Sequence, residues 1–320
     1  MLRSLLPYPV FCLCIFMLLA TDRMACSRGE TAQQPPVTNT SAAGDSVEAN
    51  PPYDFEDPAF IFELEADLTE ISGLTVLDEQ YLGAIEDENG RLYFIDLNTG
   101  EVIRHEKFAP DGDYEGLARA GNQVFILRSD GDLYVIDDWQ DDKFGSDKIE
   151  THLSSKCDAE GLTHDEANNR LLIACKESAG EDLDDLKAIY AYDLATGKVD
   201  KQPVFTLSID TFNKATYPND GPLNSAIREA VHPVLDLSGF KPSGLDIHPM
   251  TGELYVLSSV QQSIVVLSTT GDIKHIWKLV DKVLKQPEGI AFLPNGDLFI
   301  SSEGKSGHGV LIRYSYDPAN

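Results

Sequence analysis

The sequence predicts an all-β fold, a five-bladed β-propeller, from two kinds of repetition. A polar or acidic residue, a glycine and an aliphatic residue recur five times, with the glycines at positions 73, 116, 161, 244 and 289. Most of the intervals between these glycines are 43–45 residues long, a period typical of propeller blades. Apolar segments with alternating polarity, rich in aromatic and β-branched residues and separated by glycine turns, follow each copy and indicate antiparallel strands. Four such strands per repeat make one blade.

The third interval, from Gly161 to Gly244, is about twice as long as the others and leaves two interpretations. Residues 209–241 lack the strand–turn–strand pattern, and "PLNSAIREAV" within them resembles a short helix with a capping residue before it. We therefore expect one blade that carries an insertion at 209–241, which makes five blades in total. A six-bladed propeller is the alternative.

The last repeat ends after its third strand, at "VLIRYSYDPAN", so its blade lacks a fourth strand. Before the first repeat lies an unassigned apolar segment, "AFIFELE", at residues 59–65. We expect this segment to pair as the outer strand of the last blade, because that closes the ring and removes an exposed sheet edge. The propeller then spans residues 59–317.

The N-terminus predicts export. An apolar run at residues 5–20 is too short for a comfortable membrane span, and residues 1–26 are typical of a secretory signal. The small residue before Cys26 resembles a bacterial lipoprotein cleavage site, although Arg23 stands where an aliphatic residue is expected. Lipid attachment at Cys26, ordinary cleavage and an uncleaved anchor all remain open. Each places the rest of the chain outside the cytoplasm, anchored in the cell membrane or outer membrane or released from it.

Residues 27–58 are rich in Pro, Ser, Thr, Ala and Asn without apolar periodicity, which indicates a flexible linker. Of the five cysteines, Cys157 and Cys175 alone lie in the predicted propeller, near the same end of one predicted hairpin. In an oxidising compartment these two residues could form a disulfide. The alternative is a pair of buried free thiols.

The charge of the chain limits its partners. Asp and Glu number 53 against 25 Lys and Arg, for a formal net charge of −28. Nucleic acids and anionic membrane surfaces both require basic patches, so we expect neither as a partner. Membrane contact would run through the N-terminal anchor alone, and we expect a monomer. The acidic excess favours bound cations, or simply solubility.

The repeat places polar residues around one mouth of the central channel. The first strand of each blade lines that channel, so the residues before the repeated glycines should form a ring: Ser72, Glu115, Glu160, Ser243 and Glu288. Residues that end the second strands should lie beside this ring, because the two strands are antiparallel. By the repeat these are Glu86, Ser129, Glu177, Ser258 and Glu303.

Six glutamates crowded onto one face would repel one another, and burying them unpaired is costly. An all-oxygen cluster favours a hard cation, with calcium first among the candidates. The alternative is that the glutamates accept hydrogen bonds from neighbouring blades and serve only to hold them together. The sequence contains no His or Cys set with zinc-like spacing.

Three segments, "FKPSGLDIHPMTGELYVLSS", "QPEGIAFLPNGDLFISSEG" and "DAEGLTHDEANNRLLIACKE", resemble the SdiA-regulated family of bacterial envelope proteins. The resemblance covers about residues 59–317. It implies a five-bladed propeller, distantly similar to NHL-repeat propellers, with a calcium site on the glutamates that match the motif: Glu115, Glu160, Glu288, Glu177 and Glu303. Glu86 joins this set by the repeat alone.

Two functions remain open at this point. The first is an envelope-anchored, calcium-binding propeller that acts as a binding or interaction module for an unknown protein or small ligand. The second is a metal-dependent hydrolase, lactonase-like or phytase-like. The blade starts supply no asparagine of the kind that a lactonase-type site uses, and the sequence shows no basic cluster for phosphate. We therefore favour the binding module and assign no catalytic residue.

Overall fold

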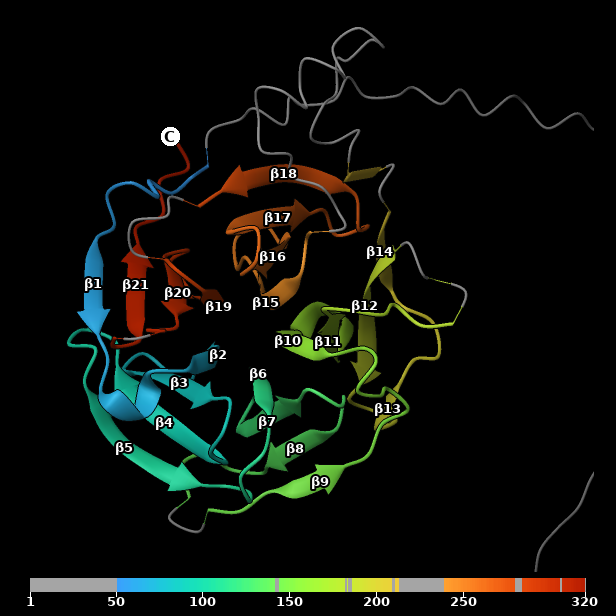
Figure 1. Ribbon diagram of the computed structural model, residues 1–320, viewed down its shortest axis with the longest axis horizontal. Helices are drawn as coiled ribbons and strands as arrows, with labels where there is room; N and C mark the ends of the chain where they lie inside the picture. Colours follow the sequence, from blue (N-terminus) through green and yellow to red (C-terminus); the bar gives the residue numbers. More distant parts are fainter. Residues whose placement is uncertain are drawn as a thin grey trace, which may run out of the picture. The chain divides into compact units, whose positions relative to one another are not determined.

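The computed structural model describes residues 51–141, 144–181, 183, 186–208, 211–212, 239–279, 284–305 and 307–319. These residues form five antiparallel sheets arranged as the blades of a propeller (Figure 1). The innermost strands of neighbouring blades contact one another around the whole ring: β2 with β6, β6 with β10, β10 with β15, β15 with β19 and β19 with β2. The prediction of a five-bladed, all-β fold is confirmed.

The first four blades follow one another along the chain. Blade 1 contains β2 (Ile71–Val76), β3 (Tyr81–Glu86), β4 (Arg91–Asp96) and β5 (Val102–Lys107). Blade 2 contains β6 (Tyr114–Ala120), β7 (Gln123–Arg128), β8 (Leu133–Ile136) and β9 (Asp147–Ile149). Blade 3 contains β10 (Ala159–Asp165), β11 (Arg170–Cys175) and β12 (Leu186–Asp193), and its outer position is shared by β13 (Lys198–Val199) and β14 (Phe205–Ser208), which both pair with β12. Blade 4 contains β15 (Pro242–Ile247), β16 (Leu254–Ser258), β17 (Ser263–Leu267) and β18 (Ile273–Lys278).

Blade 5 joins the two ends of the folded chain. Its strands β19 (Pro287–Phe292), β20 (Leu298–Ser302) and β21 (Val310–Tyr314) come from the C-terminal end, and its outer strand is β1 (Phe60–Glu63). Figure 1 shows β1 beside β21. In the register of this pair, Phe60 lies opposite Arg313 and Glu63 opposite Val310. The predicted closure of the ring by the segment at 59–65 is therefore confirmed.

The packed core begins earlier than the predicted domain boundary at residue 59. Tyr53 is 1% exposed, and its hydroxyl donates to the Gly296 carbonyl at 2.8 Å. Phe55 packs in the same cluster, with its ring 5.2 Å from that of Tyr314. Both residues fall in the segment that we expected to be linker. They add a second attachment between the N-terminal segment and the last blades.

The hydrophobic core lies between blades rather than within them. Five clusters of buried side chains each combine residues of two neighbouring blades, including the pair formed by blades 5 and 1. The repeated glycines permit this packing at the axis. A Cβ atom on Gly116 would lie 2.7 Å from Leu162 Cβ in the next blade, and one on Gly289 would lie 2.4 Å from the Ser72 carbonyl oxygen. The motif therefore needs glycine because adjacent inner strands approach too closely for a side chain.

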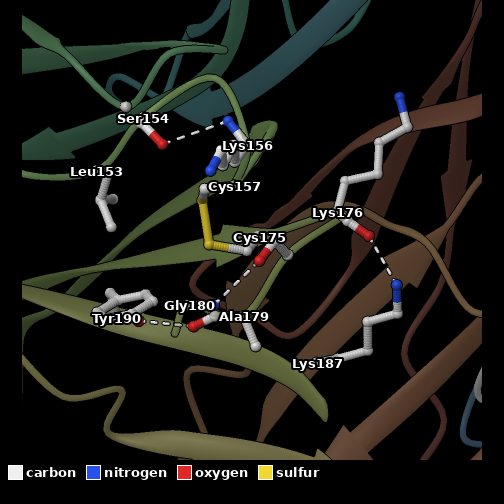
Figure 2. Close-up of a disulfide and its surroundings, with 12 residues drawn as sticks. Leu153, Ser154, Lys156, Cys157, Cys175, Lys176, Ala179, Gly180, Lys187 and Tyr190 are labelled. Atoms are coloured by element: carbon white, nitrogen blue, oxygen red, sulfur yellow. Dashed lines mark hydrogen bonds between the residues drawn. A yellow bond between two sulfur atoms is a disulfide. The ribbon is translucent and has the colours of Figure 1, made fainter. Parts of the chain in front are cut away.

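A disulfide joins Cys157 to Cys175 (Figure 2). It extends the β10–β11 hairpin, since the Lys176 amide donates to the Asp158 carbonyl at 2.9 Å. Figure 2 also shows Lys187, whose ammonium donates to the Lys176 carbonyl at 2.8 Å. The disulfide holds the backbone before Lys176, and the Glu177 amide, which donates to the Cys157 carbonyl at 3.0 Å, holds it after Lys176.

Replacing both Cys157 and Cys175 with alanine should lower stability by about 2 to 3 kcal/mol, because the bond closes a loop of moderate length in the unfolded chain. Thermal and urea melting of the double variant, beside the wild type with and without reductant, measures this loss. Wild-type protein under reductant should melt like the double variant. Equal melting of oxidised wild type and double variant would contradict the prediction.

Several predicted features lie outside the described residues. They are the signal at 1–26 with Cys26, the linker up to residue 50, and most of the insertion at 209–241. Among the residues that are described, none belongs to a helix long and apolar enough to cross a membrane. The only helices in this part of the chain with assigned bounds are two short 3-10 turns, Ala66–Leu68 and Glu166–Asn168.

Candidate functional site

Every inner strand has an irregular register at the residue before its repeated glycine. In β10, Ala159 pairs with Cys175 and Gly161 with Ala174, so Glu160 has no partner on β11. The same irregularity occurs in β2, β6, β15 and β19. A β-bulge bends its strand and redirects a side chain. The repeat therefore encodes a bulge at the axis in each of the five blades.

Three of these bulge residues are glutamates that converge on the channel. Glu115, Glu160 and Glu288 line a hollow of about 10 Å³ together with the repeated glycines and the side chains that follow them. That volume is about the space that one water molecule needs. The axis is therefore almost filled, and whatever enters it is no larger than a water molecule or a single ion.

The two serines at the same position do something different. Ser72 Oγ donates to the Tyr114 carbonyl at 2.8 Å, and Ser243 Oγ donates to the Pro287 carbonyl at 2.9 Å. Each bond crosses from one inner strand to the next. The serines thus join neighbouring blades through the backbone. This is the role that we considered as an alternative for the glutamates.

Burial raises the pKa of all three channel glutamates. Burial, followed by the charges of Glu160 and Asp113, raises the pKa of Glu115 to about 10. Burial raises the pKa of Glu160 to about 8 even though Lys176 opposes the shift, and it raises that of Glu288 to about 7. Perturbed carboxyl groups of this kind cluster at functional sites.

Lys176 is the internal counter-ion of the channel. Its ammonium lies 2.5 Å from Glu160 Oε1 and 3.7 Å from Asp158 Oδ2. Burial alone would lower the pKa of Lys176, but the charge and hydrogen bond of Glu160 together with the charges of Asp158 and Glu115 outweigh it, and the net pKa is raised. Burial raises the pKa of Glu288, and the hydrogen bond from Ser259 Oγ at 2.8 Å and the charge of Lys176 partly oppose that rise. Glu115 is thus the channel glutamate with the least compensation.

The strand register corrects the second predicted ring. In each blade, one residue of the second strand pairs with the inner-strand residue just before the bulge. These second-strand residues are Glu86, Arg128, Cys175, Ser258 and Ser302. Glu86 and Ser258 therefore end their strands as predicted, whereas Ser129 and Glu303 lie one residue, and Glu177 two residues, beyond the strand end. Our sequence alignment of the blades mixed three registers, and a shift of one residue turns a side chain to the other face of a strand. In blade 3 it is Lys176, and not Glu177, that lies beside the channel glutamates and lines the cavity with Glu160 and Glu288.

Glu86 and Glu177 accordingly serve other contacts. Glu86 is 3% exposed, and its carboxylate accepts hydrogen bonds from the Glu88 and Asn89 amides in its own turn. Glu177 is exposed and forms an ion pair with Lys241 of the next blade, which lowers its pKa. None of Glu86, Glu177 and Glu303 lines the channel hollow. Burial, and after it the charge of Asp87, raises the pKa of Glu303.

A larger cavity opens where the channel meets the surface. This mouth pocket has a volume of about 470 Å³, and Lys176, Lys241, Lys285 and Lys305 line it together with Glu160 and Glu288. The sequence shows no basic cluster, because these lysines are far apart in the chain. They come from blades 3, 4 and 5. The mouth pocket is the part of the site that sequence reasoning missed.

Comparison with known proteins now assigns the chain to a family. The model of the SdiA-regulated family matches residues 59–306, which is most of the propeller. The chain belongs to the SdiA-regulated family. No curated protein sequence matches it.

Solved structures share the fold of this SdiA-regulated protein at low sequence identity. A glutaminyl cyclase from Myxococcus xanthus superposes with a TM-score of 0.50 at 13% identity, over 82% of this chain and 96% of that one. A virginiamycin B lyase from Staphylococcus aureus gives 0.42 at 14% identity, over 76% and 67% of the two chains. A protein of unknown function from Bacteroides thetaiotaomicron gives 0.46 at 14% identity, over 76% and 55%. At 13% identity the likeness to the glutaminyl cyclase shows the fold alone.

The ligand atoms in the channel of this SdiA-regulated propeller suit a hard cation, but their arrangement does not. Its donors are oxygen atoms, and the strongest charges around Glu115 are carboxylates. Against this, Glu160 is already paired with Lys176. Within the described residues, no group of three or more His, Cys, Asp or Glu side chains is arranged to hold a metal ion. Binding would therefore require the glutamates to move.

Proposed function

We propose that this protein is an exported binding module of the cell envelope whose ligand site is the mouth of the propeller channel, and that the channel glutamates bind Ca²⁺. The observation that carries the proposal is the convergence of three carboxylates, buried Glu160 and half-buried Glu115 and Glu288, on one hollow of atomic size. Keeping several carboxylates charged together there requires a compensating cation. Lys176 supplies one positive charge, and a divalent ion would compensate the remainder.

The N-terminal sequence supports the proposed location. The signal-like run before Cys26 favours export and attachment to the cell membrane or outer membrane, and the linker that follows would hold the propeller away from the bilayer. The net charge of −28 disfavours nucleic acid as a partner and limits membrane contact to the anchor. We propose that the propeller acts as a monomer that presents its mouth to a ligand in the periplasm or outside the cell.

Calcium should raise the melting temperature of the wild type above its value in chelator. At a calcium concentration about 100 times the dissociation constant, the gain in the free energy of unfolding should be about 2.7 kcal/mol. Glu115→Gln should abolish this shift, because Glu115 is the channel carboxylate with least compensation. Glu101→Gln, which removes the same charge from an exposed turn, should leave the shift unchanged. A calcium shift of equal size in wild type and Glu115→Gln would contradict the proposed site.

The calcium shift should also grow as the pH rises from about 6 to about 9, since calcium binds the deprotonated carboxylates. The pKa values of Glu288, Glu160 and Glu115 are raised to about 7, 8 and 10. Folded-state pKa values above the unfolded value give stability that is present at low pH and is lost as pH rises through them. The calcium-free protein should therefore lose stability over the range in which calcium gains effect.

A metal-dependent hydrolase remains the second candidate, and one observation favours it. Glu288 lines the mouth pocket with a pKa of about 7, which suits a general acid or base at neutral pH. The glutaminyl cyclase with this fold is an enzyme, so propellers of this shape permit catalysis. Calcium-dependent turnover of lactones or phosphate esters, lost in Glu288→Gln, would favour the hydrolase over the binding module.

A further inference from the structure

The mouth pocket combines positive charge at its rim with one buried and one half-buried carboxylate where it meets the channel. Lys285 and Lys305 are exposed, whereas Glu160 is 4% exposed and lines both the pocket and the channel hollow. Glu288 likewise lines both spaces. The two ends of the pocket therefore differ in depth and in charge.

The four pocket lysines divide into two pairs. Lys176 is bound to Glu160, and Lys241 forms an ion pair with Glu177. Among the residues that the structure describes, no ion pair joins Lys285 or Lys305 to a carboxylate. The charge of Lys305 acts on Glu303 without forming an ion pair, so the ammonium groups of this second pair are exposed at the rim to an anionic group from outside.

This concentration of positive charge is unusual for the molecule. The chain has a net charge of −28, and three other cavities in its described part, of about 350 to 560 Å³, have at most one lysine or arginine in their walls. In the mouth pocket four lysines face two glutamates. Clustered charge of one sign raises the local concentration of ligands of the opposite sign. The rim therefore selects anions although the protein as a whole repels them.

The deep end of the pocket requires the opposite chemistry. Glu288 already accepts a hydrogen bond from Ser259, and Gln286 donates to Glu303 at 2.6 Å. An anionic group that reached Glu160 and Glu288 would be repelled, whereas a hydroxyl or ammonium group could donate to them. A ligand that fills the pocket should therefore carry an acid group at one end and a donor group at the other. The volume of about 470 Å³ suits a small molecule.

We propose that the mouth pocket binds a small organic anion with a hydroxyl or ammonium group, such as an amino acid or hydroxy acid. Its acid group lies at Lys285 and Lys305, and its donor group faces Glu288. This inference names the ligand class of the site proposed above and rests on that proposal, but it does not require calcium.

Titration calorimetry with simple acids tests the inference. The probes are glycine, 4-aminobutyrate and 6-aminohexanoate, beside acetate, butyrate and hexanoate as matched acids without the amine, all at constant ionic strength. At least one amino acid should bind about tenfold tighter than its matched acid, because only it meets both ends of the pocket. Butylamine, which lacks the acid group, should bind no better than butyrate.

The variant Lys285→Gln/Lys305→Gln should weaken the tightest of these probes by about tenfold or more. Lys201→Gln removes the same kind of charge from an exposed position that does not line the pocket, and it should bind as the wild type does. Both variants should melt like the wild type, since the replaced lysines are exposed. Glu288→Gln should remove the advantage of the amino acid over its matched acid.

The inference is overturned if no probe binds the wild type more tightly than about 10 mM, or if the lysine double variant binds all probes unchanged. Equal affinity for each amino acid and its matched acid would overturn the assignment of Glu288. Running the series in chelator and in calcium separates the two proposals. If the wild type binds the acids but shows no calcium shift, the calcium site alone is rejected. If it shows the calcium shift but binds none of the acids, the ligand class alone is rejected.

Discussion

Replacing Lys176 with methionine should destabilise the calcium-free protein by about 3 to 5 kcal/mol at about pH 9, because it leaves a buried carboxylate without its counter-ion. Glu160 is 4% exposed, and Lys176 is the nearest positive charge, at 2.5 Å. Methionine keeps most of the length and the apolar contacts of the lysine side chain. The loss would therefore report charge rather than packing.

The same substitution should cost less than about 1 kcal/mol at about pH 5, because the pKa of Glu160 would rise further and the group would take up a proton. In the wild type that pKa is already raised to about 8 by burial, against the effect of Lys176. Stability held by a raised pKa is present at low pH and lost as pH rises. The destabilisation should therefore grow steadily between these two values. Urea unfolding at several pH values in chelator measures it.

Two further variants test the cause. Adding Glu160→Gln to Lys176→Met should restore most of the lost stability at high pH, because no unpaired charge remains. Lys148→Met breaks a more exposed pair with Asp132 and should have little effect at either pH. A Lys176→Met variant that loses equal stability at low and high pH would show that the lysine acts by packing and not as a counter-ion.

The sequence predicted the ring of glutamates but not their counter-ion, and the bulges explain why. The motif before each glycine is visible as a repeat, so the bulge residues Glu115, Glu160 and Glu288 could be aligned from sequence alone. The ends of the second strands have no such marker. A bulge on the inner strand changes which residue faces it across the pair, so Glu177 was taken for the position that Lys176 occupies.

The mouth pocket and the N-terminal aromatics escaped prediction for other reasons. The pocket lysines meet only because three blades bring their loops to one face, Lys176 from blade 3, Lys241 from blade 4, and Lys285 and Lys305 from blade 5, and no local pattern signals such an encounter. Tyr53 and Phe55 stand as single aromatic residues in a polar, proline-rich segment without periodicity. Their burial depends on a cleft between the last blades, which exists only once the ring has closed.

A stepwise truncation of the N-terminal segment should separate these contributions. A chain that begins at residue 51 should melt like the full-length protein, because the residues removed lie before Tyr53. A chain that begins at residue 59 loses the buried rings of Tyr53 and Phe55 and should be destabilised by about 3 to 5 kcal/mol. Melting followed by circular dichroism measures each step, and Tyr53→Ala in the full chain should reproduce much of the second loss.

The last step should abolish cooperative folding. A chain that begins at residue 66 lacks β1 and Leu64, which is 2% exposed, so β21 becomes an unpaired edge and the core between blades 5 and 1 is opened. Because the inner strands form a closed circle of contacts, weakening one junction removes support from both neighbouring blades. A truncated chain from residue 66 that melts cooperatively at the wild-type temperature would show that the ring is stable without this strand.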